Sequence, residues 1–366
     1  MRTKHAVTIE TEPRIPLEEA PPVEVRPYAA SDREAWSQYL GKHPQATFFH
    51  TLDWDEIIRR TFSHESRFLI AHRDGQISGI LPLTRVSSAF FGTSLISVPF
   101  GVYGGLLVDD QKSADALLKA AGEVVATEKA KYAELRHLHR PDIDLPRNEL
   151  YATFIEDVPG DAEGCLARLP RKARAEVRKC LKDELLTAEE EGISLEDFHR
   201  LFSLNKRKLG SPLFPSSLFW HIRDVLGAEN APILTVKRDG RVLATVMSFV
   251  FQDTIMPYYS GSAPDADRFR GNNFMYFKLM EWASERGLKK FDFGRSRVET
   301  GSFSFKKHQG FEPIPLSYDY LLAEGEEIPS LNPSNPKFRM AKRVFRRMPL
   351  WMAQKVGSWL VKRAPF

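Results

Sequence analysis

The stretch from Gly271 to Phe311 restricts the fold more than any other part of this 366-residue chain. It opens with two apolar rows at helical spacing, Phe274, Phe277 and Met280 in one and Met275, Leu279 and Trp282 in the other. A helix that is apolar on most of its circumference is typically buried. Gly287 then stands where a helix C-terminus favours a left-handed residue, so we expect the helix to end there.

A short strand is predicted directly after this helix, over Leu288 to Phe293, and it runs into the string FDFGRS at residues 291–296. Its two phenylalanines share one face, and Asp292 points to the other face. Gly294 breaks the strand and leaves Arg295 and Ser296 at its end. An aromatic-rich turn is predicted at 303–307. Because strand ends and the loops beyond them often carry polar chemistry, we expect functional residues here.

The rest of the chain predicts two copies of one fold. Residues 23–157 read as a strand, two helices, antiparallel strands, an amphipathic helix and a further strand, and residues 158–323 repeat this order. Asp74-Gly75 and Asp239-Gly240 are strong hairpin signals, one in each half. We therefore expect an α/β (α+β) protein of two domains, each a mixed, mostly antiparallel sheet flanked by helices.

The two ends have a different character. Residues 1–22 hold four glutamates and four prolines and are expected to be a disordered leader. Residues 324–366 read as a linker followed by a basic amphipathic tail, in which 337–366 carry nine Lys or Arg and no Asp or Glu. Pro349 should divide this tail into two short helices.

The tail has an apolar row opposite most of its cations, formed by Phe338, Ala341, Phe345, Met348, Met352, Val356 and Trp359. Basic amphipathic segments with aromatic residues bind anionic membranes, so residues 337–363 predict a peripheral membrane contact. The alternative is that the apolar row packs back onto the rest of the protein.

Composition excludes several classes of protein. Cys165 and Cys180 give no disulfide framework and fit a reducing compartment. The N-terminal residues have no apolar core typical of a signal peptide, and no window approaches the ~18 apolar residues of a transmembrane helix. We therefore expect a cytoplasmic protein, with a peripheral contact at the inner face of the cell membrane through its tail.

Four strings carry a family resemblance. They are FDFGRS, TGSFSFKKHQGFEP, LPRKARAEVRKCLK and FFGTSLISVPFGVYGG, and together they place the resemblance over about Arg26 to Leu322. They resemble the FemAB-type transferases, in particular those associated with bacterial exosortase/PEP-CTERM and exopolysaccharide systems. One departure is Gln309, where this resemblance leads us to expect an aromatic residue.

The resemblance implies two tandem GNAT-like acyltransferase domains that transfer an acyl or aminoacyl group to an amine. It implies no tightly bound cofactor, and an aminoacyl-tRNA or an acyl-CoA as co-substrate. The implied acceptor is an anionic cell-envelope, saccharide or exopolysaccharide precursor. The competing hypothesis is an inactive, membrane-associated scaffold that keeps the fold; an open cleft with Lys306 exposed would favour the enzyme.

A basic helix is the first candidate site. Its cations fall mostly on one face and include Arg171, Arg174, Arg178 and Lys179. Such a face can bind a phosphate or carboxylate through charge-assisted hydrogen bonds. By spacing alone a solvated surface helix is the simpler interpretation, whereas the resemblance implies a helix beside the substrate cleft.

The second candidate is the loop at Arg268, Gly271 and Asn272. GNAT enzymes hold the coenzyme A pyrophosphate on backbone amides of a loop of the form (Q/R)-x-x-G-x-(G/A) before a helix, where the helix N-terminus favours anions. Here Arg268 and Gly271 fit the pattern, but Asn273 stands where Gly or Ala is expected. The alternative is that Gly271-Asn272 only caps the helix.

The third candidate is the strand end itself. Asp292 is predicted to orient or deprotonate an amine, Arg295 and Ser296 to bind the substrate, and Lys306, by its match to the family, to stabilise an oxyanion. The simpler interpretation is an Asp292–Arg295 pair that shapes the turn and a surface lysine.

Tyr258 and Tyr259 end a strand expected to face the same cleft, as core residues or as ligand contacts. The sequence shows no metal-ligand spacing, no usable Ser-His-Asp set, no Walker motif and no nucleic-acid module.

Overall fold

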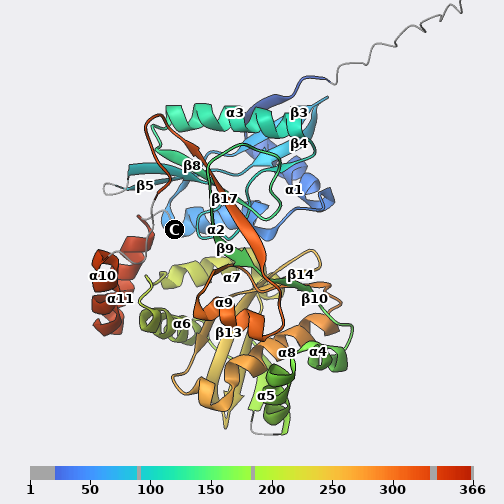
Figure 1. The fold of residues 1–366 in the computed structure, drawn as a ribbon, viewed down its shortest axis with the longest axis vertical. Helices are drawn as coiled ribbons and strands as arrows, with labels where there is room; N and C mark the ends of the chain where they lie inside the picture. The colour runs from blue at the N-terminus through green and yellow to red at the C-terminus, as the bar shows by residue number, and fades with distance from the viewer. Residues whose placement is uncertain (1–20, 89–91, 183–185, 330–335, 364–366) are drawn as a thin grey trace, which may run out of the picture.

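The computed structural model describes residues 21–88, 92–182, 186–329 and 336–363. Most of the predicted leader, residues 1–20, therefore lies outside the described residues. Figure 1 shows two lobes that follow each other along the longest axis of the molecule, with the tail helices beside their junction. The predicted class is confirmed, because both lobes contain sheets flanked by helices.

The first lobe contains two sheets. One has the order β1 (Glu24–Pro27), β3 (Leu69–Arg73), β4 (Gln76–Leu81), β7 (Leu107–Val108). The other has the order β16 (Ser296–Arg297), β9 (Arg147–Thr153), β17 (Ile314–Leu322), β8 (Tyr132–His137), β6 (Gly92–Ile96), β5 (Thr84–Ser88), β2 (Glu65–Ser66). The helices of this lobe are α1 (Arg33–Lys42), α2 (Leu52–Phe62) and α3 (Gln111–Thr127), with short 3-10 turns at Ala30–Asp32 and Phe48–His50.

The second lobe is built on one sheet. Its order is β10 (Ile155–Asp157), β15 (Lys290–Asp292), β14 (Thr254–Ser262), β13 (Arg241–Phe251), β12 (Ile233–Arg238), β11 (Leu186–Glu190). Its helices are α4 (Ala162–Arg168), α5 (Arg171–Lys182), α6 (Leu195–Leu209), α7 (Ser216–Asn230), α8 (Gly271–Glu285) and α9 (Gly301–His308), with a 3-10 turn at Ala266–Phe269. The tail forms α10 (Pro336–Arg347) and α11 (Leu350–Val361).

The two lobes exchange strands, which the sequence analysis does not anticipate. By its position in the chain β17 is expected to complete the second domain, but its hydrogen-bonded partners are β8 and β9 of the first lobe. In the other direction β10, from the end of the first half, pairs with β15. The physical reason is that a strand joins the edge that offers free backbone groups, and this pairing depends on contacts far apart in sequence.

Local signals are confirmed where backbone geometry decides them. Gly287 follows α8 with φ +70°, and Asp74-Gly75 and Asp239-Gly240 have positive φ at both residues, as a two-residue hairpin turn requires. Pro349 separates α10 from α11 as predicted. The turn expected at 303–307 is wrong, because these residues form α9, whose N-cap Thr300 accepts a hydrogen bond from the Phe303 N–H.

Among the described residues, each lobe contains one pair of parallel strands, and each pair is hydrogen-bonded over a short stretch. In the first lobe β6 and β8 pair only at Leu95↔Ala133 and Ile96↔Glu134. The chain from Ser97 to Gly104 then fills the gap, since the Ser97 N–H donates to Glu134 O and the Gly104 N–H donates to Arg136 O. In the second lobe β14 and β15 pair only at Thr254↔Lys290 and Ile255↔Phe291.

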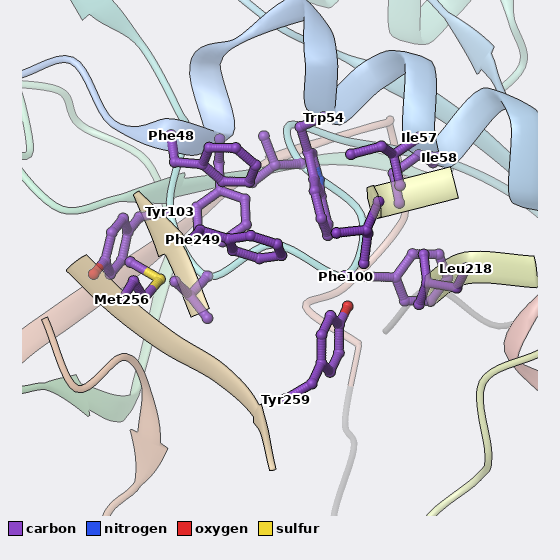
Figure 2. Packing of buried hydrophobic residues seen from close by; sticks show 14 of the residues in the cluster. Phe48, Trp54, Ile57, Ile58, Phe100, Tyr103, Leu218, Phe249, Met256 and Tyr259 are labelled. Atoms are coloured by element: carbon purple, nitrogen blue, oxygen red, sulfur yellow. The ribbon is translucent and has the colours of Figure 1, made fainter. Parts of the chain in front are cut away.

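A shared aromatic core joins the lobes. Phe48 of the first lobe stacks on Phe249 of β13, with ring centroids 4.4 Å apart and an interplanar angle of 19°. Trp54 of α2 packs edge-on against Phe249, and its indole N–H donates to Pro99 O at 3.2 Å. Figure 2 shows these rings beside Tyr103, Phe100 and Met256. Because large aromatic surfaces are buried on both sides, the two lobes form one continuous core here.

Candidate functional site

The turn at Gly294 holds Asp292 and Lys306 on its two sides. The Gly294 N–H donates to Asp292 Oδ1 at 2.8 Å, and Lys306 Nζ donates to Gly294 O at 2.8 Å and to Arg295 O at 3.2 Å. Gly294 has φ +69°, a conformation that favours glycine. The FDFGRS string thus forms a strand end and a left-handed turn, and α9 carries the lysine back to that turn.

Both ionisable groups are buried, and burial moves their pKa values toward each other. Asp292 is 3% exposed, and desolvation raises its pKa to about 7, against the lowering effects of the Gly294 N–H and of Lys306. Lys306 is 8% exposed, and desolvation lowers its pKa to about 7. A carboxyl that titrates near neutrality is suited to accept and return a proton.

Asp292 lines a cavity of about 560 Å³ between the lobes. The second lobe contributes Met256 of β14 and Ile155 of β10, and the first lobe contributes Thr47 and Tyr103. A larger hollow of about 780 Å³ lies beside Tyr39 and His43 on the first lobe. We place the site at the smaller cavity, because it contains the carboxyl whose pKa is raised to about 7.

Tyr103 is a cavity residue that the sequence analysis did not single out. Its ring is buried, and its hydroxyl has no hydrogen-bond partner among the described residues. A buried polar group without a partner is costly, so an unused phenolic donor in a cavity indicates a ligand contact. The sequence showed only an aromatic residue in a Gly-rich loop, FGVYGG, which gives no signal for this role.

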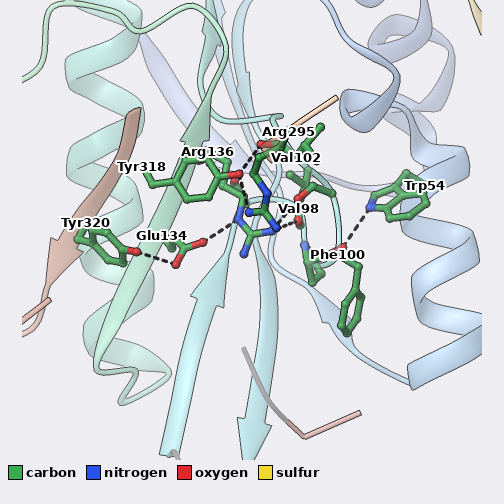
Figure 3. Close-up of polar contacts among 12 residues, drawn as sticks. Trp54, Val98, Phe100, Val102, Glu134, Arg136, Arg295, Tyr318 and Tyr320 are labelled. Carbon is green, nitrogen blue, oxygen red and sulfur yellow. Dashed lines mark hydrogen bonds and ion pairs between the residues drawn. The ribbon is translucent and has the colours of Figure 1, made fainter. Parts of the chain in front are cut away.

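Arg295 lies on the opposite side of the Gly294 turn, among tyrosines. Its guanidinium donates to Tyr318 Oη at 2.8 Å and lies 4.4 Å from the centroid of the Tyr151 ring. Figure 3 shows Arg295 near Arg136, whose own guanidinium binds Glu134, Val98 O and Gly101 O. The predicted Asp292–Arg295 ion pair is absent from the interactions among the described residues, so this interpretation of Arg295 is wrong.

Lys206 is a second cation at this place, and the sequence analysis missed it. It lies near the end of α6, and burial together with the charge of Arg295 lowers its pKa. No carboxylate forms an ion pair with Lys206 or Arg295 within the described ranges, and no carboxylate contributes to the pKa shift of either group. Two neighbouring cations without a counter-charge favour an anionic ligand. The only sequence signal is the basic end of α6, NKRK.

Three further residues that the sequence predicts for the site are Tyr258, Tyr259 and Ser296. Tyr258 is half-buried and donates to Phe100 O at 2.5 Å, so it links the lobes. Tyr259 is buried among Phe202, Phe219 and Phe249, and its hydroxyl lacks a partner in the part of the chain that the structure describes. Ser296 is buried, and its hydroxyl likewise lacks a described partner. Ligand contact by Ser296 and the two tyrosines stays a prediction.

The basic helix α5 does not reach the cavity. Figure 1 places it at the end of the second lobe that is furthest from the first lobe. Arg171, Arg178 and Lys179 are exposed, while Arg174 is half-buried and donates to Leu169 O at 2.9 Å. The cations thus form an exposed surface, and their binding of an anionic substrate stays a prediction.

The loop before α8 lies against α5. Arg270 forms an ion pair with Glu176 of α5, and Cys180 Sγ lies 3.7 Å from Phe269 O. The ion pairs of Arg270 with Glu176 and of Arg241 with Asp265 balance most of the loop's charge, and Asp267, which accepts from the neutral Asn272 amide, offsets Arg268 in number. Arg268 is exposed beside the Phe269 ring.

Aromatic side chains pack near the end of β15. The rings of Tyr276, Phe293 and Phe305 pack with centroids 4.6–6.2 Å apart.

Within the described ranges, no group of three or more His, Cys, Asp or Glu side chains is placed to hold a metal ion. Across the same residues, no helix combines the length and apolar character needed to cross a membrane.

Comparison with known proteins identifies the type of fold. Residues 167–307 match the family model of the acetyltransferase (GNAT) domain. Among solved structures, FemX is 18% identical, with a TM-score of 0.64 and coverage of 82% of this chain and 97% of FemX. A tandem GNAT protein from the clavulanic acid biosynthesis pathway is 12% identical, with a TM-score of 0.53 and coverage of 81% and 97%.

A third structure is the C-terminal domain of a putative lysylphosphatidylglycerol synthetase from Agrobacterium fabrum, 14% identical, with a TM-score of 0.50 and coverage of 80% of this chain and 91% of that one. No curated protein matches the chain. The likenesses confirm the predicted GNAT-like fold and its similarity to FemX. The association with an exosortase/PEP-CTERM system stays a prediction.

Proposed function

We propose that this GNAT-type acyltransferase transfers an acyl or aminoacyl group to an amine in the cavity between its lobes, with Asp292 as the general base. The acyltransferase class follows from the GNAT domain at residues 167–307. The observation that carries the assignment of the site is a buried carboxyl with a pKa of about 7 in a cavity of about 560 Å³. General bases work best when their pKa lies near the operating pH.

In the proposed reaction, every proton and bond is accounted for by the donor, the acceptor and Asp292. The amine nitrogen of the acceptor attacks the carbonyl carbon of the donor, and Asp292 takes the proton that the nitrogen loses. The C–N bond forms as the bond from the carbonyl carbon to the donor oxygen or sulfur breaks, and the proton returns from Asp292 to that leaving atom. The enzyme ends in its starting state, as required for turnover.

Lys306 is a positioning residue in this proposal. Its amine donates to two backbone carbonyls of the Gly294 turn, and it is buried beside Phe154 and Phe293. The simpler interpretation of Lys306 as a surface lysine is wrong, because its side chain is 8% exposed. The Tyr103 hydroxyl lines the cavity and lacks a described partner, so we assign oxyanion stabilisation to Tyr103.

For the donor we favour an aminoacyl-tRNA over an acyl-CoA. The loop at Arg268 and Gly271 has balanced charges, which gives a pyrophosphate little net attraction. The exposed cations of α5 are suited to a phosphate backbone.

For the acceptor we propose a cell-envelope or exopolysaccharide precursor that carries both an amine and an anionic group. Lys206 and Arg295 would bind the anion, because neither has a carboxylate counter-ion within the described residues. Such precursors are assembled on the cytoplasmic side of the membrane, so we propose that the protein acts there. The inactive scaffold remains the alternative and predicts no transfer at all.

The test is transfer of a radiolabelled amino acid from aminoacyl-tRNA to precursors in a membrane extract. Asp292→Asn should lower the rate about 10²- to 10⁴-fold, because a positioned general base contributes that much. The matched control is Asp253→Asn, which changes an exposed carboxyl that lines the same cavity. Equal loss in both variants, or an unchanged rate in Asp292→Asn, would refute the assignment of the base.

A further inference from the structure

The tail helices α10 and α11 have an inner face that is fixed to the second lobe. Phe345 and Ala353 pack against Leu213, which lies in the segment after α6. A Cβ at Gly357 would lie 2.5 Å from the Leu213 backbone N, so α11 approaches the chain closely at this glycine. Two hydrogen bonds add to the contact, from Arg207 to Met348 O and from Arg346 to Leu209 O. The tail is therefore part of the folded protein.

The outer face of the same helices carries large apolar side chains. Trp351 is 59% exposed and Trp359 is 46% exposed, and they lie on one row of α11 because they are eight residues apart. Met340 and Val344 are exposed on α10 at a spacing of four residues. The inner face, by contrast, is buried, because Phe345 and Ala353 fill the contact with Leu213. We call the exposed set the outer tail face.

The two tail helices are also rich in cations. Those with exposed side chains are Lys342, Arg343, Arg346, Arg347, Lys355 and Lys362. Lys355 lies between the two tryptophans in the row, with its amine 5.8 Å from the centroid of the Trp351 ring. Residues 337–363 contain no Asp or Glu. Long cationic side chains can lay their stems along apolar surface and keep their charge at the polar boundary.

We propose that the outer tail face docks on an anionic lipid bilayer, with Trp351 and Trp359 inserted at the headgroup boundary. Tryptophan favours this boundary, and a basic amphipathic surface binds anionic lipid through both its apolar area and its charge. A second copy of the chain is a poor occupant, because a symmetric contact would place this acid-free face against itself and its cations against cations.

The docking surface differs from the one that the sequence pattern predicts. The predicted row included Phe345, which faces inward, and omitted Trp351, which faces outward. The predicted alternative, in which the tail packs on the fold, is true of the inner face. Docking on a bilayer is independent of the transfer reaction. Helix α6 both carries Lys206 and contacts the tail, so a docked tail would hold Lys206 near the membrane.

The test is co-sedimentation of the full chain with phosphatidylcholine vesicles and with vesicles that contain 30 mol% (about one lipid in three) phosphatidylglycerol. We expect binding only to the anionic vesicles, and weaker binding at about 0.5 M salt, where charges are screened. The double change Trp351→Gln and Trp359→Gln should lower the partition coefficient about tenfold or more. Neutralising Arg343 and Arg347 with Gln should lower it about fivefold per charge.

The matched control is Trp220→Gln, which removes an exposed tryptophan of α7, 51% exposed, outside the tail. It should leave binding unchanged, and circular dichroism should show all variants folded. Equal binding to neutral and anionic vesicles would overturn the proposal. So would the absence of binding to anionic vesicles. A dimer in sedimentation velocity that the double tryptophan change dissociates would then show that the outer tail face joins two copies.

Discussion

Replacing Asp292 by Asn and Lys306 by Met in one variant should change how stability depends on pH. Burial raises the pKa of Asp292 from 3.8 to about 7 and lowers the pKa of Lys306 from 10.5 to about 7. Between about pH 4 and 7 the native protein therefore keeps an Asp292 proton that the unfolded chain has lost. Between about pH 7 and 10.5 it has lost a Lys306 proton that the unfolded chain keeps.

Stability falls with rising pH where the native state binds more protons than the unfolded state, and it rises where the native state binds fewer. Because of Asp292, the free energy of unfolding thus falls as the pH rises from about 4 to 7. Because of Lys306, it rises as the pH rises from about 7 to 10.5. A pKa change of one corresponds to about 1.4 kcal/mol, so the full effects are about 4 kcal/mol for Asp292 and about 5 kcal/mol for Lys306. Wild-type stability should therefore pass through a minimum near pH 7 that the variant lacks.

The variant also loses the hydrogen bonds from Lys306 to Gly294 O and Arg295 O, which costs about 1–3 kcal/mol at every pH. This constant does not alter the shape of the curve. Thermal unfolding at pH 5, 7 and 9 is the assay. The difference in Tm, variant minus wild type, should be about 3–5 °C more positive at pH 7 than at either end. About 3 kcal/mol is lost or gained over two pH units, and the unfolding entropy of a chain of 366 residues is about 0.8 kcal/mol/K.

The control variant combines Asp253→Asn with Lys307→Met, which changes two exposed charges near the same elements. Its difference from wild type should be nearly flat from pH 5 to 9, because exposed groups couple weakly to folding. A flat difference for the Asp292 and Lys306 variant would refute the reasoning. The two groups would then not be buried with pKa values near 7, and the assignment of the general base would fail with them.

Three further predictions concern the reaction. Tyr103→Phe should lower kcat about 10²-fold with little change in Tm, because it removes an oxyanion donor that has no partner to lose among the described residues; an unchanged kcat in steady-state assays would contradict this role. Lys206→Gln should raise the KM for the acceptor about tenfold and leave kcat unchanged, whereas Lys208→Gln, an exposed change on the same helix, should do neither. Arg178→Glu with Lys179→Glu should weaken tRNA binding in a filter-binding assay and reduce the salt dependence (slope of log K against log salt) by about two. Acetyl-CoA should give no binding heat by calorimetry, and tight acetyl-CoA binding that is lost in Gly271→Glu would show that coenzyme A is the donor.

The sequence was sufficient for features that depend on local geometry. The Asp-Gly pairs specify hairpin turns, since few residues other than Gly, Asn and Asp adopt positive φ easily. Pro349 separates the tail helices, and Gly287 ends α8. The string FDFGRS predicted a strand end with Asp292 and Arg295 near the site, because alternation and a glycine break can be read from neighbouring residues.

The tertiary structure decided which of these residues meet, and which groups are buried. The exchange of β10 and β17 depends on strand edges that no local pattern specifies. Lys206 reaches Arg295 across 89 positions of sequence, and Tyr103 joins Asp292 in one cavity only through the packing of the two lobes. The pKa values of Asp292 and Lys306 approach 7 because both side chains lose water, and solvent exclusion is a property of the assembled core, which a single sequence pattern does not contain.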